Sequence, residues 1–183
     1  MKNVRVAFRF NDNDIVPIGY KKIPGRLIFD VKMLSLTRKA RYVAGGHKTD
    51  PPKESVYSSV VSRESVRLAF LVAALNDVDI LAADIQNAYL EAITKEKVYI
   101  VVGKEFGSDE GRPAVIVRAL YGLKSSGVRF RDSLVSVLRD MGFRSCLVDP
   151  DVHMRKATKP NGDKIWEYVL CYVDDVLVVS HEP

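Results

Sequence analysis

The chain has 183 residues, of which 47% are hydrophobic and 28% are charged, and its formal net charge is +5. This length suits one globular domain of moderate size, or two closely packed subdomains, and is enough to bury a core. The longest apolar runs fall far short of the roughly 20 residues that a membrane span needs, and no secretory signal is present. We therefore expect a soluble, intracellular protein. Two cysteines and three scattered histidines indicate neither a disulfide framework nor a zinc site.

The first 50 residues predict a β-rich region. Four strand-like stretches are separated by turns: 4–10, 15–20, 26–32 and 39–44. Pro17 makes the second stretch an edge strand at best, because proline has no N–H to donate. Lys39 and Arg41 alternate with apolar residues, so both project from one face of the last strand. The region holds 11 Lys and Arg against 4 Asp, an excess that favours polyanions, although a Lys-x-Arg pair alone is typical of a solvated strand face.

A helix is predicted after Ser62, which is a suitable N-cap. Apolar side chains follow at helical spacing: Val66, Ala69, Phe70 and Ala73. Further apolar side chains lie on the other sides: Leu68, Leu71, Val72 and Leu75. Because the helix is apolar on nearly every side, we expect it to be buried.

A short apolar strand beginning at Val78 runs into Asp84. An acid at the end of a buried strand is well placed at the mouth of a cleft. Taken alone, Asp84 is also a suitable helix N-cap, because residues 87–90 can continue a helical turn. Tyr89 alone is also compatible with a core tyrosine whose hydroxyl is hydrogen-bonded.

Residues 120–127 predict a strand-to-helix turn, in which Ser125 or Ser126 can cap the next helix. That helix is predicted over about 127–141, and Gly142 ends it. One broad face carries its apolar side chains: Phe130, Leu134, Val137, Leu138 and Met141.

Two adjacent carboxylates, Asp174 and Asp175, lie between two apolar runs. The runs, 166–173 and 176–180, are rich in β-branched and aromatic residues and follow a turn at 160–163, so they predict a β-hairpin with a two-residue Asp-Asp connection. At such a tip both carboxylates can converge on a hard cation, for which carboxylate oxygens are preferred ligands. A solvated Asp-Asp turn is the alternative.

Four motifs, in this order, strongly resemble the reverse transcriptase of copia-type retrotransposons: 39–46, 84–90, 120–124 and 172–175. The resemblance runs from about Pro17 to the C-terminus. The order of the predicted elements gives an α+β fold, with helices packed on one face of an antiparallel sheet. The resemblance implies polymerase fingers, in a fingers-rich part of about 1–76, and a palm of about 77–183 that contains this sheet. The protein would reside in a cytoplasmic particle or the nucleus.

The resemblance also implies an activity, RNA-directed DNA polymerisation by two-metal nucleotidyl transfer from deoxynucleoside triphosphates to a primer 3′-OH. Asp84, Asp174 and Asp175 would be the catalytic, metal-binding acids, with Ile85 as a further metal position. The metal would be Mg²⁺, or Mn²⁺. Two divalent ions stabilise the attacking oxygen and the leaving pyrophosphate together, and three crowded acids would repel one another without a cation.

The remaining implied roles concern the substrates, which are the triphosphate and an RNA or DNA template with its primer. Lys39 and Arg41 would bind the triphosphate, since Arg offers a planar fork of donors and Lys a compact charge. Tyr89 would exclude a ribose 2′-hydroxyl. Gly122 and Lys124 would belong to the loop beneath the nascent base pair.

Two alternatives remain open. Another metal-dependent palm enzyme, such as a nuclease or cyclase, would need only the aspartates. A catalytically silent remnant would merely bind nucleic acid. The chain stops eight positions after Asp175, whereas polymerases of this type continue with a thumb and an RNase H domain. We therefore expect a truncated fragment in which the thumb is absent.

Overall fold

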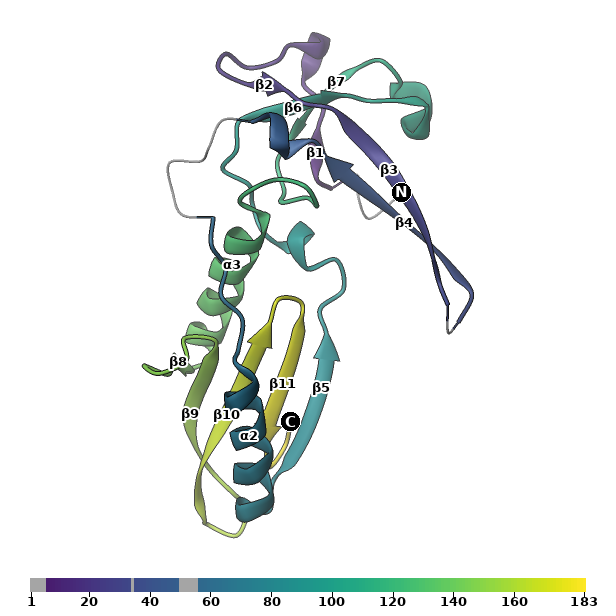
Figure 1. Ribbon diagram of the computed structural model, residues 1–183. Helices are drawn as coiled ribbons and strands as arrows, with labels where there is room; N and C mark the ends of the chain where they lie inside the picture. Colours follow the sequence, from purple (N-terminus) through teal and green to yellow (C-terminus); the bar gives the residue numbers. More distant parts are fainter. Residues whose placement is uncertain (1–5, 34, 50–55) are drawn as a thin grey trace. The chain divides into compact units, whose positions relative to one another are not determined.

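A computed structural model describes residues 6–33, 35–49 and 56–183 (Figure 1). The chain divides into two compact units, each built from two segments. The first unit combines Met1–Tyr57 with Tyr89–Phe130, and the second combines Ser58–Ala88 with Arg131–Pro183. The chain therefore passes between the two units three times.

The first unit is rich in short strands, as its sequence predicts. Its strands are β1 (Phe8–Arg9), β2 (Lys21–Lys22), β3 (Gly25–Lys32), β4 (Thr37–Ala44), β6 (Val98–Val101) and β7 (Pro113–Ile116). Strands β1, β7, β6 and β2 form one sheet in that order, and β3 pairs with β4 in a separate antiparallel ribbon. Short 3₁₀ segments complete it: η1 (Asp12–Asp14), η2 (Gly46–Lys48), η3 (Ala88–Glu91) and η4 (Lys104–Asp109).

The four expected N-terminal strands fare differently. Those at 26–32 and 39–44 are confirmed as β3 and β4. Of the stretch 4–10, residues 4 and 5 lie outside the described residues and only Phe8–Arg9 is strand. The strand expected at 15–20 is wrong. A turn forms there instead, with the Tyr20 N–H bonded to the Pro17 carbonyl and Gly19 at φ +86°, a conformation that glycine adopts without strain.

An aromatic cluster anchors the core of the first unit. The rings of Phe8, Tyr42 and Phe106 meet edge to face, with centroids 5.3 to 5.7 Å apart, the arrangement that aromatic quadrupoles favour. Burial, and secondarily the charge of Glu105, raises the pKa of Tyr42 to about 12. Tyr42 therefore holds β4 to the core by the face opposite to Lys39 and Arg41.

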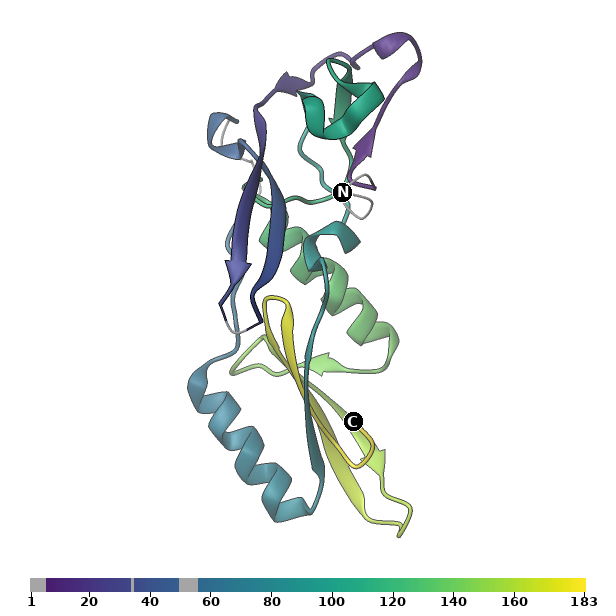
Figure 2. The same cartoon turned by 90° about the vertical axis from the view of Figure 1, so that its right-hand side faces the viewer.

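The second unit contains a five-stranded antiparallel sheet, and helices lie against this sheet (Figures 1 and 2). Its order is β5 (Asp79–Asp84), β11 (Asp175–Ser180), β10 (Lys164–Tyr172), β9 (Val152–Thr158) and β8 (Arg144–Ser145). The helices are α2 (Arg63–Asn76) and α3 (Ser126–Asp140), the latter beginning in the first unit's segment. The mixed α+β class and the expected hairpin strands are confirmed. In the part of the chain described, no helix is long and apolar enough to cross a membrane.

The expectation that the helices cover one face of this sheet is wrong. Leu170, Leu177 and Val179 pack in the cluster that contains the α2 residues Ala69 and Ala73. Their neighbours on the same strands pack instead with Leu134 and Leu138 of α3: Val169, Cys171, Val176 and Val178. Because successive strand residues face opposite ways, α2 and α3 cover opposite faces, and the unbroken apolar runs of β10 and β11 reflect burial on both.

Helix α2 begins as predicted but is not buried all round. The Ser62 hydroxyl oxygen accepts a hydrogen bond from the Ser65 N–H at 3.1 Å, which makes Ser62 the N-cap. Three leucines face solvent with exposed fractions of 53 to 75%: Leu68, Leu71 and Leu75. The helix meets the sheet through the face that carries Ala69 and Ala73, so among the described residues no side chain buries the leucines on its other side.

Helix α3 is also confirmed, and Gly142 follows it at φ +87°. Its apolar face is narrower than expected, because Val137 and Met141 are more than half exposed while Phe130 and Leu138 are buried.

Candidate metal and nucleotide site

The acidic turn, Tyr172–Asp175, connects β10 to β11 in a register that differs from the predicted one. Tyr172 pairs with Asp175, so the two connecting residues are Val173 and Asp174, and Asp175 is the first residue of β11. The expectation that Asp174 and Asp175 form the connection is wrong, because the connection lies one residue earlier in the chain. A slip of two positions between the strands keeps every side chain on its own face, so the apolar alternation cannot distinguish the two registers.

The pairing of β11 with β5 brings two of the acids together. Asp175 lies directly opposite Asp84, and the Ile85 N–H donates to the Asp174 carbonyl at 2.8 Å. Directly opposed residues on antiparallel strands have Cβ atoms about 4.5 to 5.5 Å apart and face the same side. The alternative reading of Asp84 as a helix N-cap does not hold, since Asp84 ends a strand and a turn follows it. Two acids 91 positions apart in sequence number thus become neighbours.

This donor set fits a divalent ion that shares its coordination with a substrate. In the described ranges, no group of three or more His, Cys, Asp and Glu side chains is placed to hold an ion by itself. Magnesium commonly binds one or two carboxylates, keeps several waters and takes substrate phosphates as further ligands. Asp84 and Asp175 supply such a pair, Asp174 adds a carboxylate in the connection, and Ile85 can offer only its backbone carbonyl.

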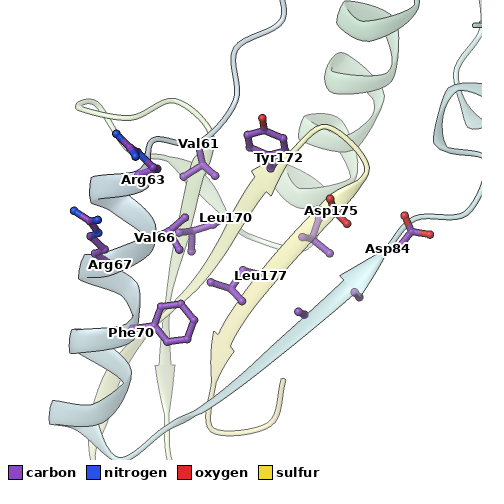
Figure 3. A pocket seen from close by; sticks show the side chains of 13 residues that line it. Val61, Arg63, Val66, Arg67, Phe70, Asp84, Leu170, Tyr172, Asp175 and Leu177 are labelled. Carbon is purple, nitrogen blue, oxygen red and sulfur yellow. The ribbon is translucent and has the colours of Figure 1, made fainter. Parts of the chain in front are cut away.

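A pocket begins at this pair and extends between α2 and the sheet (Figure 3). Asp84, Asp175 and Tyr172 contribute to its lining from the sheet, and Arg63 and Arg67 contribute from α2, with their guanidinium groups pointing away from the sheet in Figure 3. Apolar side chains form much of the remaining lining: Val66, Phe70, Leu170 and Leu177. The acids therefore border an open, largely apolar pocket of the second unit.

Val173 at the acidic turn has a strained backbone. Its φ is +55°, a region in which a β-branched residue is rare and costs free energy. Strain of this kind persists only where the surroundings over-determine the conformation. The pairing of β11 with β5 on one side and with β10 on the other provides that constraint.

Two of the expected substrate residues, Arg41 and Tyr89, contact the same side chain of the first unit. The Tyr89 ring packs on Tyr121, with centroids 4.8 Å apart, and meets Phe130 edge-on at 6.3 Å. The Arg41 guanidinium lies over the Tyr121 ring at 5.6 Å. The Nε atom of Arg41 is buried and finds no acceptor among the described residues. Arg41 and Tyr89 thus flank one tyrosine, and an unused donor remains on the arginine.

Gly122 and Lys124 belong to the turn that follows Tyr121. A Cβ at Gly122, whose φ is +91°, would run into the Ala44 carbonyl, so this glycine lets the turn approach the end of β4. The Lys124 ammonium donates to the Thr49 carbonyl at 2.6 Å. Lys39 is half-buried on β4, on the same face as Arg41.

The two serines expected to cap α3 make other bonds. Ser125 donates through its N–H and hydroxyl to Glu96 (2.9 and 2.7 Å), and the Ser126 hydroxyl donates to the Leu120 carbonyl at 2.6 Å. These bonds fix the turn to the rest of the first unit.

The sequence analysis missed two acids of the second unit, Asp149 and Asp151. Both are buried, and Asp151 pairs with Arg131 of α3 at 2.7 Å. The Asp-Pro-Asp sequence before a strand was the available signal, because carboxylates are rarely buried without partners. It did not reveal which partners they have.

Comparison with known proteins shows the family of this chain. The family model described as reverse transcriptase (RNA-dependent DNA polymerase) matches residues 11–183. The chain belongs to this reverse transcriptase family. Among curated relatives, it is 31% identical to the retrovirus-related Pol polyprotein from transposon RE1 of Arabidopsis thaliana over 155 residues, which is 81% of this chain and 10% of that protein.

Two further relatives extend the match. The corresponding polyprotein of transposon RE2 from the same plant is 30% identical over 154 residues, again 81% of this chain and 10% of the relative. That of transposon TNT 1-94 of Nicotiana tabacum is 25% identical and covers 91% of this chain and 13% of the relative. The resemblance to copia-type reverse transcriptases is thereby confirmed. The chain spans about a tenth of the length of these reverse transcriptase relatives.

Proposed function

We propose that this chain is the nucleotide-adding part of an RNA-directed DNA polymerase, in which Asp84, Asp174 and Asp175 bind two divalent metal ions. The first unit corresponds in this proposal to the fingers and the second to the palm. The substrates are deoxynucleoside triphosphates and a primer annealed to an RNA or DNA template.

One observation carries the proposal: the direct pairing of Asp84 with Asp175 in a chain of the reverse transcriptase family. Nothing in the described part of the chain neutralises these carboxylates by an ion pair. Two like charges on adjacent strands are unfavourable without a counter-charge. A bound cation provides that counter-charge.

When bound, the ions would stabilise both the attacking 3′-oxygen and the leaving pyrophosphate. The chain's own part is to hold the carboxylates in place, because positioning and electrostatic stabilisation dominate phosphoryl transfer. Two backbone constraints serve this purpose, the Asp84–Asp175 pairing and the bond from Ile85 to Asp174.

The first unit would bind the triphosphate. Arg41 offers a buried Nε donor that the described residues leave without an acceptor, and Lys39 adds a second positive charge on the same strand face. Gly122 and Lys124 would contribute from the turn beneath the base pair. The Lys124 ammonium gives one of its three N–H donors to the Thr49 carbonyl, which leaves two for a phosphate.

Tyr89 would discriminate against ribonucleotides. Its contacts with Tyr121 and Phe130 hold the ring in a defined orientation, as a residue that excludes a 2′-hydroxyl by occupying its space requires. The same contacts also suit a purely packing tyrosine, so the sugar preference of a Tyr89 variant decides between the two roles.

Primer extension on an RNA template with Mg²⁺ tests the proposal directly. Wild-type protein should add deoxynucleotides, Asp175→Asn should not, and the control Asp140→Asn, at an exposed position of α3, should behave as wild type. Extension by Asp175→Asn at the wild-type rate would refute the metal assignment. Incision of the template without extension would favour a nuclease instead.

A further inference from the structure

On the side of β10 that faces β9, the strand pairing ends just before the acidic turn. Strand β9 accompanies β10 only as far as Leu170. At the next residue, the Cys171 N–H donates to the Asp151 carbonyl at 2.9 Å, and the Cys171 carbonyl accepts from the Val61 N–H at 3.0 Å. Two non-strand segments therefore take over the pairing at the base of the acidic turn.

Asp149 joins these two segments. Its Oδ2 accepts from the Ser62 N–H at 3.0 Å and from the Ser65 hydroxyl at 2.6 Å, and its Oδ1 accepts from the Asp151 N–H at 3.2 Å. Burial alone would raise the pKa of the Asp149 carboxyl, but these hydrogen bonds outweigh it and hold the pKa below its ordinary value. One ionised side chain thus fixes the start of α2 next to Val61.

Asp151 connects the same segment to the helix on the opposite face of the sheet. Its Oδ1 pairs with the Arg131 Nε at 2.7 Å, and its side chain is only 2% exposed. Residues 149–151, which we name the clamp, therefore contact α2 through one acid, α3 through the other, and β10 through the Asp151 carbonyl.

We propose that Asp149 and Asp151 are positioning residues that set the place of the acidic turn relative to Asp84. The inference rests on the proposed function in one respect, that the turn holds metal ligands. Strand β5 fixes the turn from one side through the Ile85–Asp174 bond, and the clamp fixes it from the other. Metal ligands tolerate misplacement of only about 0.5 Å, so a turn held on one side alone would bind metal poorly.

Amide hydrogen exchange in the full chain tests the clamp without relying on activity. In Asp149→Ala, exchange at the Val61 and Cys171 amides should accelerate about tenfold, because losing a charge-assisted bond frees that segment locally. Asp149→Asn retains one carbonyl oxygen and should show a smaller rise, and Ser65→Ala, which removes one donor, a smaller one still.

Glu167→Gln is the matched control. Glu167 is an equally buried acid with its own ion pair, but it lies at the other end of β10. This variant should lower global stability while leaving the relative exchange at Val61 and Cys171 unchanged. A uniform rise across the sheet in Asp149→Ala, with Val169 and Leu177 rising as much as Cys171, would overturn the clamp.

Manganese binding provides the second readout. Calorimetry should show Mn²⁺ binding to Asp149→Ala and Asp151→Asn weakened about 10- to 100-fold, the range typical of residues that support metal ligands without touching the metal, and unchanged in Glu167→Gln. Unchanged binding in the clamp variants would also overturn the proposal. If wild-type protein binds no Mn²⁺, the proposed function fails, while the local exchange pattern still decides for or against the clamp.

Discussion

The carboxylates at the two ends of the second unit's sheet have opposite surroundings. Glu167 on β10 is 3% exposed and accepts hydrogen bonds from the Ser180 hydroxyl (2.5 Å) and the Arg155 Nε (2.7 Å), with His181 Nδ1 at 3.3 Å. At the other end of the sheet, Asp84 and Asp175 are exposed and face each other without a cation from the described part of the chain.

The difference separates a structural acid from a candidate functional one. Burial would raise the pKa of Glu167, but the bonds from Ser180 and Arg155 outweigh it and hold the pKa below its ordinary value, so its charge favours folding. Asp84 and Asp175 have no such partners among the described residues, and like charges placed directly opposite each other on neighbouring strands are unfavourable. Groups that lower stability at one end of a well-satisfied sheet are expected where function requires them.

The largest expected effect is on metal-dependent chemistry at Asp84 and Asp175. Asp84→Asn and Asp175→Asn should each reduce nucleotide addition on the order of 10³-fold, because each removes a ligand that acts on developing charge. The same variants should unfold at equal or higher urea concentration, since like-charge repulsion disappears. Primer extension and urea titration of the same preparations measure both effects. A clear loss of stability would contradict the view that Asp84 and Asp175 do not stabilise the fold.

At the end of the sheet that carries Glu167, removing the charge should lower stability instead of raising it. Glu167→Gln should lower the free energy of unfolding by about 2 kcal/mol, because a buried charge-assisted network loses its anion. Metal binding and primer extension at the permissive temperature should stay at wild-type levels. Chemical denaturation gives the free energy, and a change below that of the exposed control Asp140→Asn would show that the network is not stabilising.

Lowering the pH should reduce stability in two steps, first through a buried histidine and then through the hydrogen-bonded buried acids. Burial lowers the pKa of His153 below 6.5, so its protonation favours the unfolded state and stability begins to fall below about that pH. Glu167 and Asp149 have pKa values lowered from 4.5 and 3.8, so their contribution is complete above those values and is lost as pH falls further.

Urea midpoints measured from about pH 8 to about pH 3 should therefore decline in two steps. In His153→Phe the upper step should disappear and the lower one should remain. An upper step that persists in this variant would have to come from another group.

The smallest expected effect concerns the strained turn. Val173→Gly should stabilise the second unit by up to about 1 kcal/mol, because glycine adopts a positive φ without the steric cost that valine carries. Thermal unfolding measures the gain, and Val173→Ala, which keeps a Cβ, is the control. Equal melting temperatures for the two variants would mean that the strain is stored elsewhere.

The sequence alone determined the local features of this protein. The Ser62 cap, the Gly142 helix end, the two-stranded ribbon of 26–32 and 39–44, and the strand ending at Asp84 follow from capping groups, turn residues and side-chain periodicity. These signals act within a few residues of where they are read. The family could be recognised for a related reason, because four short motifs stand in a fixed order.

Tertiary structure decided between arrangements that have the same side-chain periodicity. A two-residue slip of the hairpin preserves every side-chain face, so the side-chain alternation does not show that Val173 and Asp174 form the connection. Nor does it show that Asp175 lies opposite Asp84. The apolar runs of β10 and β11 do not say which helix covers which face, and neither Asp149 nor Asp151 shows in sequence that its partners lie on α2 and α3. Long-range contacts select among locally equivalent arrangements, and they alone bring the acids of this site together.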